Sequence, residues 1–90
     1  MVTRYEYHDT RNNRWNPYDA ATCAFLESAE QANPNAIVQL QGLPFQVRFG
    51  QNARSQKMVS STGILQVNVN TENSREVRRV APMQPQQQQM

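Results

Sequence analysis

Histidine, cysteine and tryptophan occur only once each in this sequence, and its three glycines lie far apart. A metal centre draws on several His, Cys or clustered carboxylate side chains, and a phosphate-cradling loop needs closely spaced glycines. The lone Cys23 cannot form an internal disulfide, and its place on an apolar helical stripe favours a buried structural thiol over a nucleophile. His8 stands alone beside Asp9, which is typical of a solvated side chain. We therefore expect no metal site, no cofactor and no catalytic residue.

The sequence also lacks a long apolar run, since 38% of its 90 residues are hydrophobic and its mean hydropathy is −0.80. A chain of this length forms one small domain with a thin core. We assign residues 1–80 to this domain. Residues 81–90 are rich in Gln and Pro and are predicted to form a disordered tail, because they bury too little apolar surface to offset the entropy of ordering. No signal peptide or membrane segment is recognisable, so we expect a cytoplasmic and/or nuclear protein with no membrane partner.

Charge is distributed unevenly along the chain. Residues 1–40 carry a net charge of −2, and residues 41–90 carry +4. Lys57 is the single lysine among nine cationic residues, and the rest are arginines, whose planar guanidinium suits bidentate contacts with phosphate. The basic half is suited to attracting a polyanion, although its charge density is far below that of a typical non-specific DNA binder.

The first part of the chain has the pattern of two strands followed by a helix. Alternation of aromatic and polar residues predicts a strand over residues 4–8, with Tyr5 and Tyr7 on one face, and a second extended stretch follows over residues 14–18. Asp19 is a predicted helix N-cap, and residues 20–32 are rich in helix formers. The helix is expected to bury an apolar stripe of Ala21, Phe25, Ala29 and Ala32, flanked by Cys23 and Leu26.

The remainder of the chain has the pattern of strands. Pro34 ends the helix, because the residue before a proline avoids helical backbone angles. Strands are predicted over residues 36–40, 43–49, 57–59, 64–69 and 76–80. A single helix with several strands gives an α+β fold.

Several motifs in order resemble the WWE domain. They are Tyr5-Glu6-Tyr7, Trp15-Asn16-Pro17-Tyr18, Leu26-Glu27, and a late segment in which Ile64, Gln66 and Asn68 precede Arg75, Val77 and Arg79. The resemblance covers residues 4–80. In its first half the sequence is similar to the deltex-type members of the family. It implies a single helix packed on a strongly curved antiparallel sheet, a half-barrel.

The middle strand of that pattern can be aligned in two ways. In one alignment Phe45–Phe49 is the aromatic strand of the family, and residues 50–63 contain an insertion. In the other, residues 57–61 take its place and the binding aromatic residue is missing. We favour the first alignment, because Phe45, Val47 and Phe49 alternate as a half-buried strand requires.

The resemblance also implies a ligand site. Several WWE domains recognise the iso-ADP-ribose unit of poly(ADP-ribose), which presents an adenine, ribose hydroxyls and phosphates on two sides. Tyr7 would contact the base or ribose, Gln66 a polar edge and Arg75 a phosphate. The remaining expected ligand residues are Arg11 in the first turn, Phe45 in place of a ligand-facing tyrosine, and Arg78 as a source of positive field. Arg78 and Arg79 lie on opposite sides of a strand, so at most one of them should face the pocket.

Each of these residues also has an ordinary structural interpretation. Tyr7 is suited to the core as well as to a pocket. Gln66 is considered a ligand contact only because Arg75 lies at the spacing of the family motif. Trp15, Tyr18 and Leu26 are expected to be core or rim anchors of the helix–sheet packing rather than ligand contacts.

Three functions follow as hypotheses. The first is a non-catalytic, monomeric module that binds poly(ADP-ribose) or ADP-ribosylated proteins and links ubiquitination to ADP-ribosylation, in a parent ubiquitin ligase or ADP-ribosyltransferase. The second is a deltex-like protein–protein interaction module without ADP-ribose binding. The third, suggested by Phe45, Phe49 and the basic second half, is an RNA-binding domain, but no RNA-binding motif is recognisable, so nucleic acid is the least favoured partner.

Overall fold

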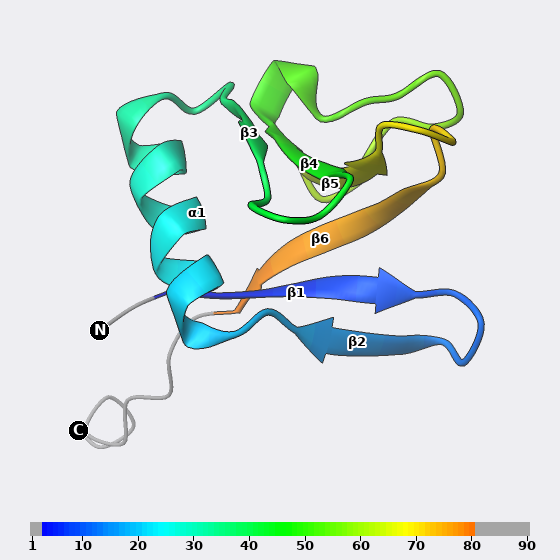
Figure 1. Cartoon of the computed structure of the whole chain (residues 1–90), viewed down its shortest axis with the longest axis horizontal. Coiled ribbons are helices and arrows are strands. Elements are labelled where there is room, and N and C mark those ends of the chain that lie inside the picture. Colours follow the sequence, from blue (N-terminus) through cyan, green and yellow to red (C-terminus); the bar gives the residue numbers. More distant parts are fainter. Residues whose placement is uncertain (1–2, 81–90) are drawn as a thin grey trace.

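The computed structural model describes residues 3–80, and the predicted tail at residues 81–90 lies outside the described residues. The elements are β1 (Arg4–Asp9), β2 (Arg14–Pro17), α1 (Ala20–Ala32), β3 (Ile37–Gln39), β4 (Phe45–Phe49), a 3-10 turn η1 (Gly50–Asn52), β5 (Ile64–Asn68) and β6 (Ser74–Val80) (Figure 1). Within the described residues, one α-helix therefore accompanies six strands, as the α+β prediction stated. No helix in residues 3–80 is long and apolar enough to cross a membrane.

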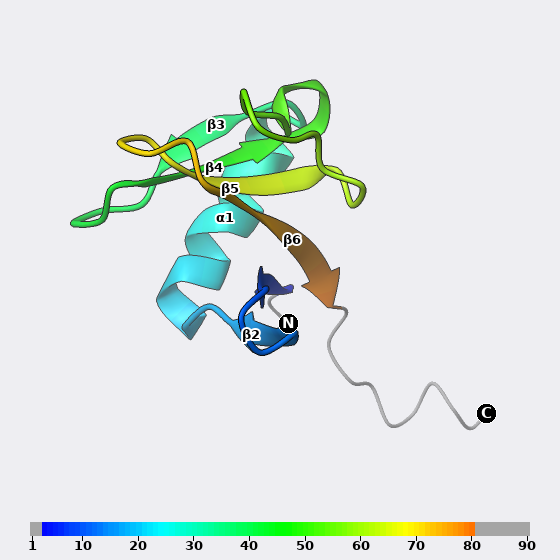
Figure 2. The ribbon, with the colours of Figure 1, turned by 90° about the vertical axis from the view of Figure 1, so that its right-hand side faces the viewer.

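All six strands belong to one antiparallel sheet in the order β2-β1-β6-β5-β4-β3. Strand β6 divides its length between two neighbours: Ser74–Glu76 pair with β5, and Val77–Val80 pair with β1. Figure 2 shows β6 passing diagonally from the β3–β4–β5 arm to the β1–β2 arm, with α1 in the hollow between the arms. The sheet is not closed and forms the expected half-barrel. We call the face toward α1 the inner face and the opposite one the outer face.

The main core fills the inner face of the sheet. Its buried members are Tyr5, Cys23, Leu26, Leu40, Val47, Phe49, Ile64 and Val77. The rings of Tyr5 and Phe49 meet edge to face with centroids 6.4 Å apart, which joins the two arms. Alternation along β1 and β4 supplies this face, and Phe45–Phe49 form a strand with the half-buried pattern predicted for them.

Helix α1 has the predicted bounds. Asp19 caps it through a carboxylate oxygen that accepts a hydrogen bond from the Thr22 amide at 2.7 Å, and the Asn33 amide closes the other end on the Ala29 carbonyl. The predicted buried stripe was wrong in part: Cys23 and Leu26 are buried as expected, but Phe25 is 47% exposed, and Ala21 and Ala32 are also exposed.

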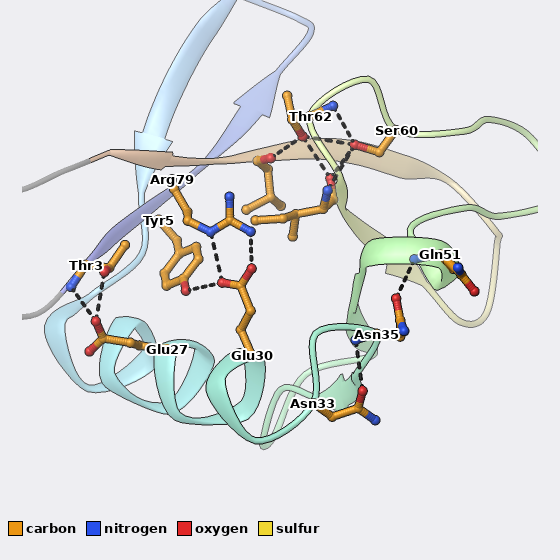
Figure 3. A network of polar contacts seen from close by, with 12 residues as sticks. Thr3, Tyr5, Glu27, Glu30, Asn33, Asn35, Gln51, Ser60, Thr62 and Arg79 are labelled. Atoms are coloured by element: carbon orange, nitrogen blue, oxygen red, sulfur yellow. Dashed lines mark hydrogen bonds and ion pairs between the residues drawn. The ribbon is translucent and has the colours of Figure 1, made fainter.

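The face that α1 turns to the sheet carries two glutamates beside its two buried residues. Cys23, Leu26, Glu27 and Glu30 have the i, i+3, i+4, i+7 spacing of one helical face. Glu27 accepts a hydrogen bond from the Thr3 hydroxyl at 2.8 Å, and Glu30 accepts one from the Tyr5 hydroxyl at 2.8 Å (Figure 3). A prediction from the apolar pattern places glutamates in solvent. For this reason the predicted buried face is shifted by about one residue from the face that packs on the sheet.

Glu30 also binds the sheet through charge. The Arg79 guanidinium donates to both of its oxygens, with Nε at 2.9 Å from Oε1 (Figure 3). The bond from Arg79 is the main reason that the pKa of Glu30 is lowered, and the Tyr5 hydroxyl adds to it. Burial and the neighbouring carboxylate raise the pKa of Tyr5, so its hydroxyl stays protonated and remains a donor.

The segment between β4 and β5 covers the outer face. Ala53 and Met58 pack there against Leu65 and Val67, which form a second buried cluster. The predicted strand over residues 57–59 was wrong, since this segment contributes only an isolated bridge between Arg54 and Val59. Hydroxyls hold it in a folded loop: Ser55 Oγ accepts the amides of residues 57 and 58, and Ser60 Oγ donates to the Ile64 carbonyl at 2.7 Å.

Replacing adjacent helix residues tests which face of α1 is buried. Leu26 is fully buried, so Leu26→Ala should lower the free energy of unfolding by about 2–5 kcal/mol. Phe25→Ala should cost less than about 1 kcal/mol despite the larger side chain, because Phe25 is exposed. Urea unfolding of both variants measures the difference. Equal costs would contradict the helix orientation described above.

The Glu30 contacts predict a pH-dependent stability. Glu30→Gln keeps an oxygen for Tyr5 and removes the charge that pairs with Arg79, so it should cost about 1 kcal/mol at pH 7. Because the pKa of Glu30 is lowered on folding, its contribution is present above the unfolded value of about 4.3 and is lost as pH falls through the folded value. Denaturant unfolding from neutral to acid pH should show the two proteins converging, and a gap independent of pH would argue against the ion pair.

Candidate functional site

A pocket of about 640 Å³ opens on the inner side of the sheet, beside the first turns of α1. This volume lies within the range of small-molecule sites. Its walls are formed by side chains from α1, from each of the six strands, and from the segments that follow β1, β2 and β3. The lining residues are Tyr7, Asp9, Arg11, Pro17, Tyr18, Asp19, Ala21, Thr22, Phe25, Gln39, Leu40, Gln41, Leu43, Phe45, Gln66 and Arg75.

An aromatic and amide pair forms one part of the lining. Gln66 lies on the inner face of β5 and is only 6% exposed. Its Oε1 accepts a hydrogen bond of 2.6 Å from the Tyr18 hydroxyl, and the ring of Tyr18 lies 5.1 Å from that of Tyr7. With Oε1 engaged in this way, the Nε2 group of Gln66 is the donor available to a ligand.

Burial gives the Tyr18 hydroxyl a fixed role. Burial raises the pKa of Tyr18, and the nearby Tyr7 adds to the increase. The hydroxyl is therefore protonated at neutral pH and donates to Gln66 rather than accepting from it. This bond fixes the orientation of the Gln66 amide before any ligand enters.

Two arginines meet one carboxylate at a second part of the lining. Arg75 lies opposite Gln66 in the β5–β6 register, and its Nη1 is 3.4 Å from Asp9 Oδ1 and from the His8 carbonyl oxygen. The same Oδ1 accepts the Arg11 amide at 3.0 Å and lies 3.6 Å from Arg11 Nε. The Arg11 amide is the main cause of the lowered pKa of Asp9, and Arg75 lowers it further. An ionised Asp9 thus leaves a net charge of about +1 on the three side chains.

The structure brings together five of the six residues expected to bind a ligand, namely Tyr7, Arg11, Phe45, Gln66 and Arg75. Arg78 is not among them. It lies on the outer face, paired with Glu6 at 2.7 Å, with its guanidinium 4.3 Å from the centre of the Trp15 ring. Arg79 turns inward but binds Glu30, so neither of the two arginines lines the pocket.

The three expected core or rim residues have different positions. Leu26 is fully buried in the core. Tyr18 packs against the core and also lines the pocket. Trp15 lies opposite His8 on β1, with the two rings 4.9 Å apart, and therefore faces away from α1.

Sequence reasoning missed Asp9, Phe25 and Leu43. The signal for Asp9 was present, because residues 5, 7 and 9 share one face of a strand. Phe25 and Leu43 are 47% and 50% exposed at the pocket, and no local pattern relates a helix residue to a turn residue 18 positions later.

The chemistry of this pocket suits a ligand that carries both a flat ring and a phosphate. Tyrosine and phenylalanine rings offer stacking surfaces, Gln66 offers an amide, and guanidinium groups bind phosphate oxygens. Among residues 3–80, no group of three or more His, Cys, Asp or Glu side chains is placed to hold a metal ion.

Comparison with known proteins gives one finding. A family model described as the WWE domain matches residues 3–79 of the 90-residue chain. No curated protein matches the sequence.

The Tyr18–Gln66 bond can be tested with two tyrosine variants. Tyr18→Phe leaves the buried Gln66 oxygen without its donor and should lower the free energy of unfolding by about 1–2 kcal/mol. Tyr7→Phe is the control, since no hydrogen bond from its hydroxyl is seen within the described chain, and it should cost less than about 0.5 kcal/mol. Thermal or urea unfolding compares them, and equal stabilities would argue against the bond.

Proposed function

Because this chain belongs to the WWE domain family, a module known for protein interaction and ADP-ribose binding, we propose that its pocket binds the iso-ADP-ribose unit of poly(ADP-ribose). The observation that carries this proposal is the pairing of Gln66 with Arg75 across β5 and β6, beside the rings of Tyr7 and Tyr18. An amide, a guanidinium and two neighbouring aromatic rings in one pocket match the base, sugar and phosphate groups of that ligand.

The aromatic residues would hold the adenine. The rings of Tyr7 and Tyr18 are tilted by 52° to each other, so they form an angled wall rather than a closed stack. Phe45 adds a third ring without a hydroxyl, so it can contribute contact area but no hydrogen bond. Gln66 would donate from Nε2 to an acceptor on the base or ribose.

The arginines would hold phosphate. Arg75 is 33% exposed at its side chain, and Arg11 is 83% exposed, so both can turn toward an anion at little desolvation cost. Asp9 keeps Arg75 near the pocket without neutralising both cations. A phosphate would share these guanidinium groups with Asp9, whose Oδ1 lies 3.4 Å from Arg75 Nη1 and 3.6 Å from Arg11 Nε.

Binding of a protein partner is a second candidate function. It is favoured by Phe25 and Leu43, two exposed apolar side chains that line the pocket. In either case the module would act by recruitment. In a longer protein, recognition of poly(ADP-ribose) would bring a ubiquitin ligase or an ADP-ribosyltransferase to modified targets.

Calorimetric titration with iso-ADP-ribose tests the first function. The wild-type domain should bind the ligand saturably, and Arg75→Gln should weaken binding at least about tenfold, because a charge-assisted hydrogen bond contributes about 1.5–3 kcal/mol. Arg54→Gln removes the same charge from an exposed residue outside the pocket and should leave affinity within about twofold.

Unfolding curves of all three proteins serve as the folding control. A folded wild-type domain that gives no binding heat would overturn the proposal and favour the protein-partner function. Equal affinity of the wild type and Arg75→Gln would exclude Arg75 from the site.

A further inference from the structure

A second recess lies next to the pocket and shares one wall with it. Its volume is about 330 Å³, and it is lined by Thr10, Lys57, Met58, Asn73, Ser74 and Arg75. Arg75 is the residue that lines both cavities. Two cations, two hydroxyls and one amide therefore surround a space that adjoins the site described above.

The position of Arg75 follows from the way in which β1 leaves β6. Pairing of these strands ends at Tyr7 and Val77, so the next residues of β1 no longer lie against β6. The Arg75 side chain crosses this gap to reach the His8 carbonyl and Asp9. Arg75 thus lies between the pocket on the inner face and the recess beside the outer loop.

Lys57 is held at the recess by two sets of contacts. Its Nζ donates to Asn73 Oδ1 at 2.9 Å, and its amide is bound by Ser55 Oγ, which in turn accepts from the Ser74 hydroxyl at 2.7 Å. The ammonium has three donors, so two remain for an anion. Glu72 lies in the neighbouring turn, but its Oε1 is near the Gln56 amide, at 3.4 Å, and it does not line the recess.

We propose that this recess is a second phosphate subsite, which takes the pyrophosphate of the ADP-ribose unit next to the one in the pocket. The inference rests on the proposed function and extends it from a single unit to the polymer. Iso-ADP-ribose ends in a phosphate on each side, so the polymer continues beyond the pocket. A chain that passes Arg75 meets the Lys57 ammonium and the Thr10 hydroxyl, which are donors for the oxygens of a pyrophosphate.

The test compares a monomer with a short polymer. Iso-ADP-ribose and a size-fractionated poly(ADP-ribose) oligomer are titrated into the wild type and Lys57→Gln at several salt concentrations. Lys57→Gln should weaken oligomer binding about three- to tenfold and reduce the salt slope by about 0.7, the value for one phosphate contact on a single strand. Affinity for the monomer should stay within about twofold.

Arg54→Gln is the matched control, because it removes one positive charge from the same loop outside the recess. It should leave oligomer affinity nearly unchanged. Equal oligomer affinity of Lys57→Gln and the wild type would overturn the subsite alone, and so would equal losses in Lys57→Gln and Arg54→Gln. A folded wild type that binds neither ligand would overturn the proposed function together with the subsite.

Discussion

The division of β6 between two partners is the constraint on which the rest of the molecule depends. Ser74–Glu76 continue the β3–β4–β5 arm, and Val77–Val80 begin the β1–β2 arm. The two arms therefore part at this junction, and α1 occupies the hollow between them (Figure 2). The same strand sends three residues inward in succession: Arg75 to the pocket, Val77 to the core and Arg79 to the helix.

The thin core of so short a chain gives polar contacts an unusual share in orienting the helix. Only Cys23 and Leu26 of α1 are buried, and the glutamates on the same face bind Thr3, Tyr5 and Arg79. Hydrogen bonds are directional, whereas apolar contact is not, so these bonds fix the rotation of the helix about its axis. The rotation leaves Phe25 exposed beside the pocket instead of in the core.

Local patterns predicted most of the fold, because its strands alternate and its helix carries a clear cap. Residues 20–32 and the Phe45–Phe49 strand were found from period, capping and propensity alone. The buried helix face was not, because two glutamates with sheet partners look like solvent residues in the sequence. Residues 57–59 have strand composition, but the amides of Lys57 and Met58 are bound by the Ser55 side chain, and composition does not show such contacts. Arg78 was wrongly assigned to the pocket, because the resemblance gives the spacing of residues but not the direction of each side chain. Leu43 and Phe25 line the same pocket only because the fold brings their segments together.

Burial of β5 on both faces has a consequence for the energetics of recognition. Ile64 lies under the helix-side core, while Leu65 and Val67 lie under the outer loop, so the strand that carries Gln66 sits at the most enclosed place in the sheet. A group held there loses almost no conformational freedom when a ligand arrives, because it had little to begin with. The Arg11 side chain differs in this respect, since it is 83% exposed and its rotamers must be ordered on contact. The buried amide would therefore provide selectivity, because its position is fixed. The exposed guanidinium would provide electrostatic attraction, because it can adjust to the position of an anion.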